Sequence, residues 1–330
     1  MTAPTLPALG TVDLSDPATF AAGPPYEYFA RLRAEAPVLR NHSGNPAIPD
    51  FWSVTRAKDI EWVSKHGTLF STWENGIWMR PDASGPLDLT RNLVIFKDPP
   101  EHTRHRKLLQ LAFTPRTIAY LEDTVRAQVT AILDRAAETG AMDIVSDLAI
   151  PVPLNVITSL LGAPDSDVPR LLDWTTRLDV GVDNPETGSG VEAFMEMAEY
   201  LGELIPTQIN SDSLIGLLAR AEVDGDRLTD DELLMFFAIL VFAGNDTTRN
   251  ATSGGALALV ENPDQLAALR NDPSLIPNAV EEVLRWTTPL NYFARTALAD
   301  TEIAGVPIPK GDVLLLWYAS GSRDEAVLPG

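Results

Sequence analysis

Thr229 to Asn250 read TDDELLMFFAILVFAGNDTTRN, and this stretch decides the fold. Thr229 and Glu232 give the T-x-x-E pattern of a capping box, which marks the start of a helix. The eleven residues from Leu233 to Ala243 are apolar on every side of that helix. A helix without a polar face is expected to run through the protein interior.

Polar residues stand at the centre of this helix, where Gly244-Asn245-Asp246-Thr247-Thr248 follow the apolar run. Helical spacing places Ala243, Asp246 and Thr247 on one face. Burying a carboxylate and a hydroxyl is costly unless they are paired or hydrated. Gly244 weakens the helix by roughly 1 kcal/mol relative to Ala and leaves room for a close ligand. Two interpretations follow: the helix holds water and passes protons here, or it leaves the core at Gly244 and continues in solvent.

The chain is strongly acidic and contains no Cys. Its 330 residues include 25 Lys and Arg against 46 Asp and Glu, a formal net charge of −21. This balance argues against binding to nucleic acids or anionic membranes, because both need basic clusters. The lack of Cys excludes disulfides, Cys-ligated zinc, iron–sulfur clusters and a Cys nucleophile within these residues.

Helical periodicity dominates the chain and predicts a mainly α protein with small β-sheets, an α+β fold. The expected helices cover residues 101–112, 116–137, 165–178, 190–204, 229–260 and 275–287. The expected strands are Pro37–Arg40, Phe51–Thr55 and a strand–turn–strand unit after Leu290. Residues 1–25 are rich in Pro and read as an N-terminal arm. No linker divides the chain, so we expect a single domain over residues 1–330.

The N-terminus shows no secretory signal, because no basic region precedes an apolar stretch between Met1 and Asp16. The longest uninterrupted apolar run, Leu233 to Ala243, is shorter than the ~18 residues that indicate a membrane span. We therefore expect a cytoplasmic protein without a membrane span.

Two turn-rich stretches, residues 72–90 and 180–190, are predicted to be loops. Long loops that carry aromatic residues often line binding sites. The first of the two contains Trp73, Ile77 and Trp78. Together with Leu240 of the long helix, these residues are the candidates for an apolar substrate pocket.

Two shorter motifs carry weaker signals. His102 and Arg106 stand four residues apart on one face of a predicted helix, where they can bind an anion. A basic surface helix explains the same pattern. Glu282 and Arg285 form an E-x-x-R pair, and on a surface such a pair contributes only ~0.2–0.5 kcal/mol.

In this order, the motifs resemble the bacterial cytochrome P-450 family, the haem-thiolate monooxygenases. AGNDTT (Ala243 to Thr248) is similar to the oxygen-activating helix of that family, and HTRHR (His102 to Arg106) to its haem-propionate helix. EVLR (Glu282 to Arg285) matches its E-x-x-R pair. FARTA (Phe293 to Ala297) resembles the strand whose Arg meets a propionate, and SRDEAVLP (Ser322 to Pro329) the next stretch. The motifs near the haem are most similar to actinobacterial enzymes that hydroxylate steroid side chains and branched lipids.

The resemblance implies a cytochrome P-450 fold and a monooxygenase that inserts one oxygen atom of O2 into an unactivated C–H bond of an apolar, steroid-like or lipid-like substrate. The cofactor would be haem b, with electrons from NAD(P)H delivered through a ferredoxin reductase and a ferredoxin. Asp246 and Thr247 would be catalytic: Thr247 hydrogen-bonds the bound oxygen, and Asp246 connects it to solvent. The other implied positions are Ala243 and Gly244 beside O2, His102, Arg106 and Arg295 at the haem propionates, and Glu282 and Arg285 as structural residues of the haem-binding core.

The haem ligand of the family is a Cys in a Phe- and Gly-rich loop, and no Cys is present in this sequence. We therefore expect a chain that ends inside the family pattern, lacks the ligand loop and final helices, and is itself inactive. The sequence offers no metal ligand in place of the Cys. The four His residues, His42, His66, His102 and His105, would not supply the electron donation of a thiolate.

A basic group made of Arg104, Arg106, Lys107 and Arg116 stands out on the acidic chain. It is either a docking surface for an acidic ferredoxin or a solvated helix face. Two other functions stay open: a non-catalytic remnant that binds an apolar ligand, and an all-helical scaffold or partner-binding protein. The scaffold does not account for the polar residues at the centre of the long helix.

Overall fold

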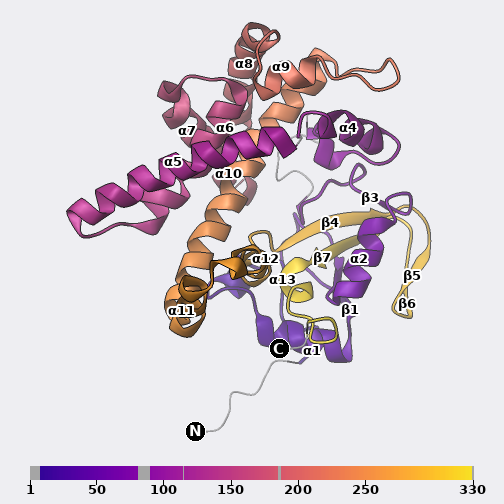
Figure 1. Cartoon of the computed structure of the whole chain (residues 1–330). Coiled ribbons are helices and arrows are strands. Elements are labelled where there is room, and N and C mark those ends of the chain that lie inside the picture. The colour runs from indigo at the N-terminus through magenta and orange to yellow at the C-terminus, as the bar shows by residue number, and fades with distance from the viewer. Residues whose placement is uncertain (1–7, 81–89, 114, 185–186, 329–330) are drawn as a thin grey trace. The chain divides into compact units, whose positions relative to one another are not determined.

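The computed structural model describes residues 8–80, 90–113, 115–184 and 187–328 (Figure 1). It is mainly helical with small sheets, which confirms the predicted fold class. The contacts of the chain form two compact units. The first unit comprises residues 1–87, 95–99 and 290–330, and the second comprises residues 88–94 and 100–289.

The first unit is built around a five-stranded sheet with the order β1-β2-β7-β4-β3. Its strands are β1 Val38–Asn41, β2 Phe51–Val54, β3 Phe70–Ser71, β4 Tyr292–Ala297 and β7 Val313–Trp317. A separate two-stranded sheet consists of β5 Thr301–Ile303 and β6 Val306–Ile308. β2 and β7 run parallel, and the other neighbouring strands are antiparallel. The strands expected on either side of residues 41–50 and after Leu290 are therefore confirmed.

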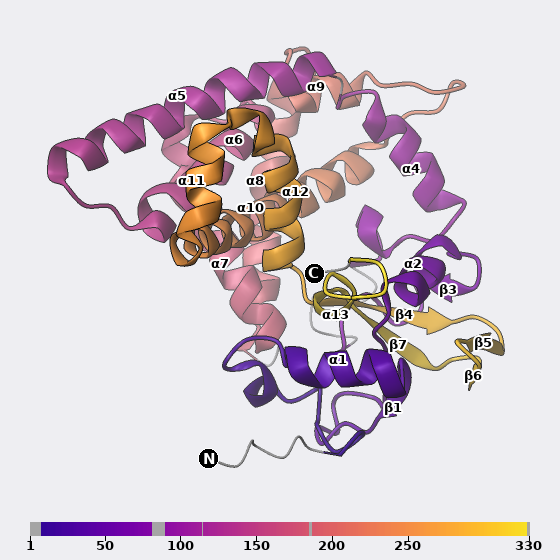
Figure 2. The ribbon, with the colours of Figure 1, turned by 60° about the horizontal axis from the view of Figure 1, so that its bottom comes forward.

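Strand β7 forms the centre of this sheet because all five residues of VLLLW are buried. A strand that is covered on both faces reads as a continuous apolar run. Side chains alternate between the two faces, so Leu315 and Trp317 enter one core cluster and Leu314 and Leu316 enter the other. Figure 2 shows β4 and β7 side by side. The helical elements of this unit are η1 Pro17–Phe20, α1 Tyr26–Glu35, α2 Ala57–Lys65 and α13 Tyr318–Gly321, and η2 Val94–Phe96 spans a sequence boundary between the units.

The described part of the expected N-terminal arm, residues 8–25, belongs to the core of the first unit. Leu14 is fully buried in the cluster that contains Phe29 and Trp317. Asp16 caps η1, because its side chain accepts a hydrogen bond from the Ala18 N–H. The arm therefore contributes buried apolar surface to this unit.

The described part of the second unit is helical. Its helices are α4 Glu101–Gln110, α5 Pro115–Thr139, α6 Pro151–Leu161, α7 Val168–Asp183, α8 Ser189–Gln208, α9 Leu214–Ala219, α10 Asp230–Glu261, α11 Pro263–Asn271 and α12 Ile276–Thr287. Shorter helical turns are η3 Ile144–Ala149, η4 Asp165–Asp167 and η6 Pro273–Leu275. All six expected helices are present. The loop predicted over 180–190 is wrong in extent, because α7 continues to Asp183 and α8 begins at Ser189.

Helix α10 is the central helix of the second unit and packs against α6, α7, α8 and α12 (Figure 1). The predicted capping box of Thr229 and Glu232 is present at its start. Phe237 and Val241 are buried in the largest apolar cluster. Farther along, a Cβ at Gly255 would lie 2.6 Å from Cγ1 of Val283 on α12, so the glycine permits the close approach of these two helices.

One stretch among the described residues, Ile144–Leu161 of η3 and α6, is long and apolar enough to cross a membrane by length and composition alone. In the structure, Leu154, Ile157 and Leu161 of this stretch are buried in the apolar cluster around α10. A core helix passes the same test, so the stretch is weak support for a membrane span.

Candidate active site

The side chain of Thr247 is bonded to its own helix. Its hydroxyl donates to the carbonyl oxygen of Ala243, one turn earlier on α10, at 2.8 Å. Since the hydroxyl proton is used in this bond, the oxygen retains lone pairs that can accept a hydrogen bond from outside the helix. Ala243 and Thr247 thus lie on one face of α10, as the spacing predicts.

The Asp246 carboxyl is mostly buried, and its two oxygens have different contacts. Oδ1 lies 3.0 Å from Nη1 of Arg249, on the next turn of α10. Oδ2 is buried without a hydrogen-bond partner among the described residues. Burial, followed by the negative charge of Asp179, raises the pKa of Asp246 to about 6, although Arg249 opposes the shift. A carboxyl with such a pKa can give up or take a proton near neutral pH.

Helix α7 supplies polar partners to this part of α10. The Asn245 amide donates to the hydroxyl of Thr175 at 3.1 Å, and both side chains are fully buried. One turn farther along both helices, Arg249 Nη2 lies 3.7 Å from Asp179 Oδ2. The sequence pointed to the α10 residues, but it gave no signal that α7 would provide Thr175 and Asp179.

The open side of Gly244 faces α6. A Cβ at this position would lie 3.2 Å from Cδ1 of Ile157, which is closer than ordinary van der Waals contact. Close packing of α10 on α6 therefore accounts for the glycine in the structure. The roles of Ala243 and Gly244 beside O2 stay predictions.

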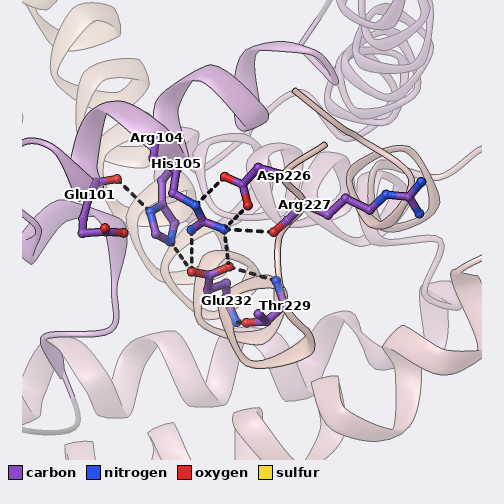
Figure 3. Close-up of polar contacts among 7 residues, drawn as sticks. All are labelled: Glu101, Arg104, His105, Asp226, Arg227, Thr229 and Glu232. Atoms are coloured by element: carbon purple, nitrogen blue, oxygen red, sulfur yellow. Dashed lines mark hydrogen bonds and ion pairs between the residues drawn. The ribbon is translucent and has the colours of Figure 1, made fainter. Parts of the chain in front are cut away.

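Helix α4 carries His102 and Arg106 on one face, with His102 partly exposed and Arg106 exposed. Next to them is a polar network that the sequence did not predict (Figure 3). The Arg104 guanidinium donates from Nε to Asp226 Oδ2 and from Nη1 to Glu232 Oε1, both at 2.6 Å. Arg104 therefore faces acidic groups of its own unit.

His105 completes this network from the buried side of α4. Its Nδ1 lies 2.8 Å from the carbonyl oxygen of Glu101, and its Nε2 lies 3.1 Å from Oε1 of Glu232 (Figure 3). Burial opposes ionisation of Glu232, but the hydrogen bonds from Arg104 and the Thr229 N–H hold its pKa below the usual value. Glu232 thus serves both the capping box of α10 and the attachment of α4.

This network removes one member from the predicted basic group of Arg104, Arg106, Lys107 and Arg116. Arg104 is engaged by two carboxylates, so its charge is largely compensated within the unit. Arg106 and Lys107 remain exposed. The side chain of Arg116 lies outside the described residues.

The E-x-x-R pair is formed on α12. Arg285 Nε donates to Glu282 Oε2 at 2.6 Å, and the guanidinium lies over the ring of Trp286. Glu282 is more than half exposed and Arg285 about a quarter exposed. The pair links adjacent turns of one helix, and its wider role in a haem-binding core stays a prediction.

In the first unit, Arg295 of β4 is a partly buried cation. Its Nη1 donates to the Ala294 carbonyl oxygen at 2.7 Å. Burial lowers the pKa of Arg295, and the nearby groups of Tyr318 and Asp98 oppose this shift. A desolvated guanidinium of this kind is suited to an anionic partner such as a carboxylate.

Ile77 and Trp78 contact β4 in the first unit. The Ile77 carbonyl accepts a hydrogen bond from the Ala294 N–H at 2.7 Å, and the Ile77 side chain is buried. Trp78 packs edge to face on Phe293, while Trp73 is partly exposed beside Lys97. Leu240 is partly buried on α10 of the second unit. A substrate pocket made of these residues stays a prediction, and residues 81–89 lie outside the described part.

Comparison with known proteins identifies the family. A cytochrome P-450 family model matches residues 195–329. The steroid C26-monooxygenase of Rhodococcus jostii (strain RHA1) is 36% identical over 327 residues, which cover 95% of this chain and 68% of that protein. The methyl-branched lipid omega-hydroxylase of Mycobacterium tuberculosis (strain ATCC 25618 / H37Rv) is 35% identical over 317 residues, which cover 90% of this chain and 72% of that protein.

Comparison with solved structures leads to the same family. A Mycobacterium marinum cytochrome P-450 in complex with pseudoionone is similar with a TM-score of 0.84 and 34% identity, covering 98% of this chain and 82% of that one. A Bacillus megaterium protein in complex with testosterone has a TM-score of 0.78 and 26% identity, and the match covers 92% of this chain and 78% of that one. The chain belongs to the cytochrome P-450 family and has its fold, and the family resemblance inferred from the motifs is confirmed. It is therefore an oxidoreductase by family.

The residues present fit a haem in part. The buried Oδ2 of Asp246, which has no partner among the described residues, is suited to an ordered water. The partly buried, desolvated guanidinium of Arg295 is suited to a propionate. The 330 residues contain no Cys, so none of them can bind the iron as a thiolate.

Proposed function

We propose that this chain has the site of a haem-dependent monooxygenase that inserts one oxygen atom of O2 into an unactivated C–H bond of a steroid-like or branched-lipid-like substrate. The observation that carries the proposal is the match to a steroid C26-monooxygenase over 95% of the chain. The polar group of Thr247 and Asp246 at the centre of α10 supports it independently.

Haem b, when bound, supplies the redox chemistry of oxygen activation. The residues of this chain supply protons and fixed hydrogen bonds. The Thr247 oxygen, whose proton is held by Ala243, accepts a hydrogen bond from a water beside α10. The Asp246 carboxyl, with its Oδ2 unpartnered among the described residues, gives up or takes a proton near neutral pH and is linked to solvent by Arg249, which is one-fifth exposed. Together they hold water and deliver protons at one place on the helix.

Cationic side chains hold the carboxylates of the haem. We assign His102 and Arg106 to one propionate and Arg295 to the other, because each can form charge-assisted hydrogen bonds. The desolvation of Arg295, which lowers its pKa, supports this role, since an anion would replace its lost hydration.

Electrons come from NAD(P)H through a ferredoxin reductase and a ferredoxin. With Arg106 assigned to a propionate, the exposed Lys107 supports a docking surface for the acidic ferredoxin that is smaller than the four-residue group proposed from the sequence. We place the protein in the cytoplasm, where these carriers are found.

The absence of Cys favours a second function for these 330 residues taken alone. We propose that they do not form the thiolate-ligated haem and do not catalyse the reaction. An apolar-ligand-binding protein without catalysis is the alternative, since its pocket would need no metal.

A haem titration of the 330-residue chain tests these proposals together. We expect haem to bind with no thiolate-type Soret band in the reduced carbon monoxide spectrum, and His102→Ala and Arg295→Met to weaken binding. The matched control is His42→Ala, which removes an exposed imidazole that pairs with Asp50. A thiolate-type band would contradict the inactivity of this chain. Saturable binding of a steroid without any haem binding would favour the apolar-ligand-binding alternative.

A further inference from the structure

Helices α7 and α10 are joined by two polar contacts with the same spacing. Thr175 and Asp179 stand one turn apart on α7, and Asn245 and Arg249 stand one turn apart on α10. The first pair, Thr175 with Asn245, is uncharged and fully buried. The second pair, Asp179 with Arg249, is charged and lies nearer solvent, with Asp179 about half exposed. Both helices belong to the second unit.

Arg249 stands between two carboxylates. It is 3.0 Å from Asp246 on its own helix and 3.7 Å from Asp179 on α7. A guanidinium that is shared between two carboxylates stabilises the negative charge of each one less than it would stabilise that of a single carboxylate. The carboxylate of Asp179 also repels a charge on Asp246 directly.

Charged groups of the other neighbouring helices do not add to this arrangement within the described residues. The charges that act on Asp246 are those of Asp179 from α7 and Arg249 from α10, with none from α6, α8, α9, α11, α12 or η3. Helix α6, whose Ile157 faces Gly244, contains no charged residue. Burial is the largest cause of the raised pKa of Asp246, and the neutral amide of Asn245 donates a hydrogen bond to Oδ1 at 3.3 Å. The charges that act on this carboxyl come from two side chains, one on each of two helices.

We propose that Asp179 and Arg249 are positioning residues that set the proton content of the Asp246 carboxyl, with Asp179 favouring the protonated acid and Arg249 the carboxylate. The proposal rests on the proposed role of Asp246 as a proton carrier. Since Asp179 belongs to α7, this helix takes part in preparing α10 for proton delivery.

The test measures the proton on Asp246 directly in the haem-free 330-residue chain. Infrared difference spectra across a pH titration follow the protonated carboxyl band that Asp246→Asn removes. We expect Asp179→Asn to lower the pKa of Asp246 and Arg249→Gln to raise it, each by about one unit, because one removes a like charge and the other an opposite charge. Asp179→Glu keeps the charge and should restore most of the original value.

Asp173→Asn is the matched control, since Asp173 lies on the same helix but pairs with Arg177. It should leave the pKa of Asp246 unchanged. Shifts of Asp179→Asn and Arg249→Gln in the same direction, or no shift in either, would overturn the proposal, because general loosening of the fold cannot produce opposite signs. Absence of haem binding in the wild-type chain would count against the proposed function alone, since this titration needs no haem.

Discussion

The hydroxyl of Thr247 donates to the Ala243 carbonyl oxygen, 2.8 Å away on the preceding turn of α10. This bond fixes the direction of the hydroxyl and leaves its oxygen as an acceptor. A threonine held in this way can order a water beside the helix without changing its own rotamer. The same contact ties the function of Thr247 to the local geometry of α10.

Removal of the Thr247 hydroxyl should uncouple electron use from product formation. In this chain joined to a segment that supplies a haem-ligating Cys, we expect Thr247→Ala to lower product formed per NAD(P)H by about tenfold and to increase hydrogen peroxide. Thr247→Ser keeps the hydroxyl and is the control. Unchanged product yield per electron in Thr247→Ala would show that the assigned role is wrong.

Asp246 is expected to make the folded protein less stable as the pH rises. Its pKa is raised to about 6 in the folded state from 3.8, so between these values the folded chain holds a proton that the unfolded chain has lost. Stability then falls as the pH rises through this window and stays low above it. Asp246→Asn should remove the decline and increase the free energy of unfolding at pH 7.5 by on the order of 2 kcal/mol.

Urea unfolding at pH 5 and pH 7.5 measures this effect. Asp173→Asn, which removes an exposed carboxylate on α7, should not change the difference between the two pH values. A lower stability of Asp246→Asn at pH 7.5 would mean that the Arg249 contact outweighs the cost of burial.

Glu232 should be a major source of stability in the second unit. Glu232→Gln weakens the contacts with Arg104 and His105 and is expected to reduce the free energy of unfolding at pH 7 by about 1–3 kcal/mol. Because the folded-state pKa of Glu232 is lowered, its stabilisation is present above pH 4.5 and is lost as the pH falls through the folded value. Glu222→Gln, in the exposed pair with Arg227, should cost less than about 0.5 kcal/mol. Equal effects of the two variants at pH 7 would contradict this account.

The crossing of α7 and α8 should not tolerate a side chain at Gly181. A Cβ there would lie 2.6 Å from the Gly190 Cα and 2.8 Å from its nitrogen, and backbone atoms cannot move aside singly. Although Ala favours a helix by about 1 kcal/mol over Gly, we expect Gly181→Ala to be destabilising by about 1–3 kcal/mol. At Gly202 of α8 the nearest atom would be 3.9 Å away, so Gly202→Ala should be neutral or stabilising. The thermal unfolding temperatures of Gly181→Ala and Gly202→Ala test both expectations.

Local signals explain why the long helix could be predicted. The capping box and the apolar run of α10 lie within a few residues of each other, and both are present as expected. The loop predicted over 180–190 was too long for the opposite reason. Gly181 looks like a turn residue in the sequence, but the structure uses it for the contact with Gly190 inside a continuing helix.

The candidate site was predictable along one helix and unpredictable across helices. Spacing alone places Ala243 and Thr247 on a common face, and the hydrogen bond between them agrees. The contact of Arg249 with Asp179 joins residues 70 positions apart, and no local pattern encodes it. The sequence did not predict the Arg104 network because its acidic partners lie more than 120 residues later in the chain. Asp226 belongs to a turn, and Glu232 belongs to the first turn of α10.

Strand β7 is inserted between β2 and β4, and the indole N–H of Trp317 donates to the Ser53 hydroxyl, 264 residues earlier in the chain. A chain emerging from the ribosome cannot complete this sheet until residues 313–317 have been synthesised. Residues 100–289 of the second unit are already available by then. We therefore expect the helical unit to acquire protease resistance first during synthesis, and the sheet to close late, because contacts between distant residues form slowly.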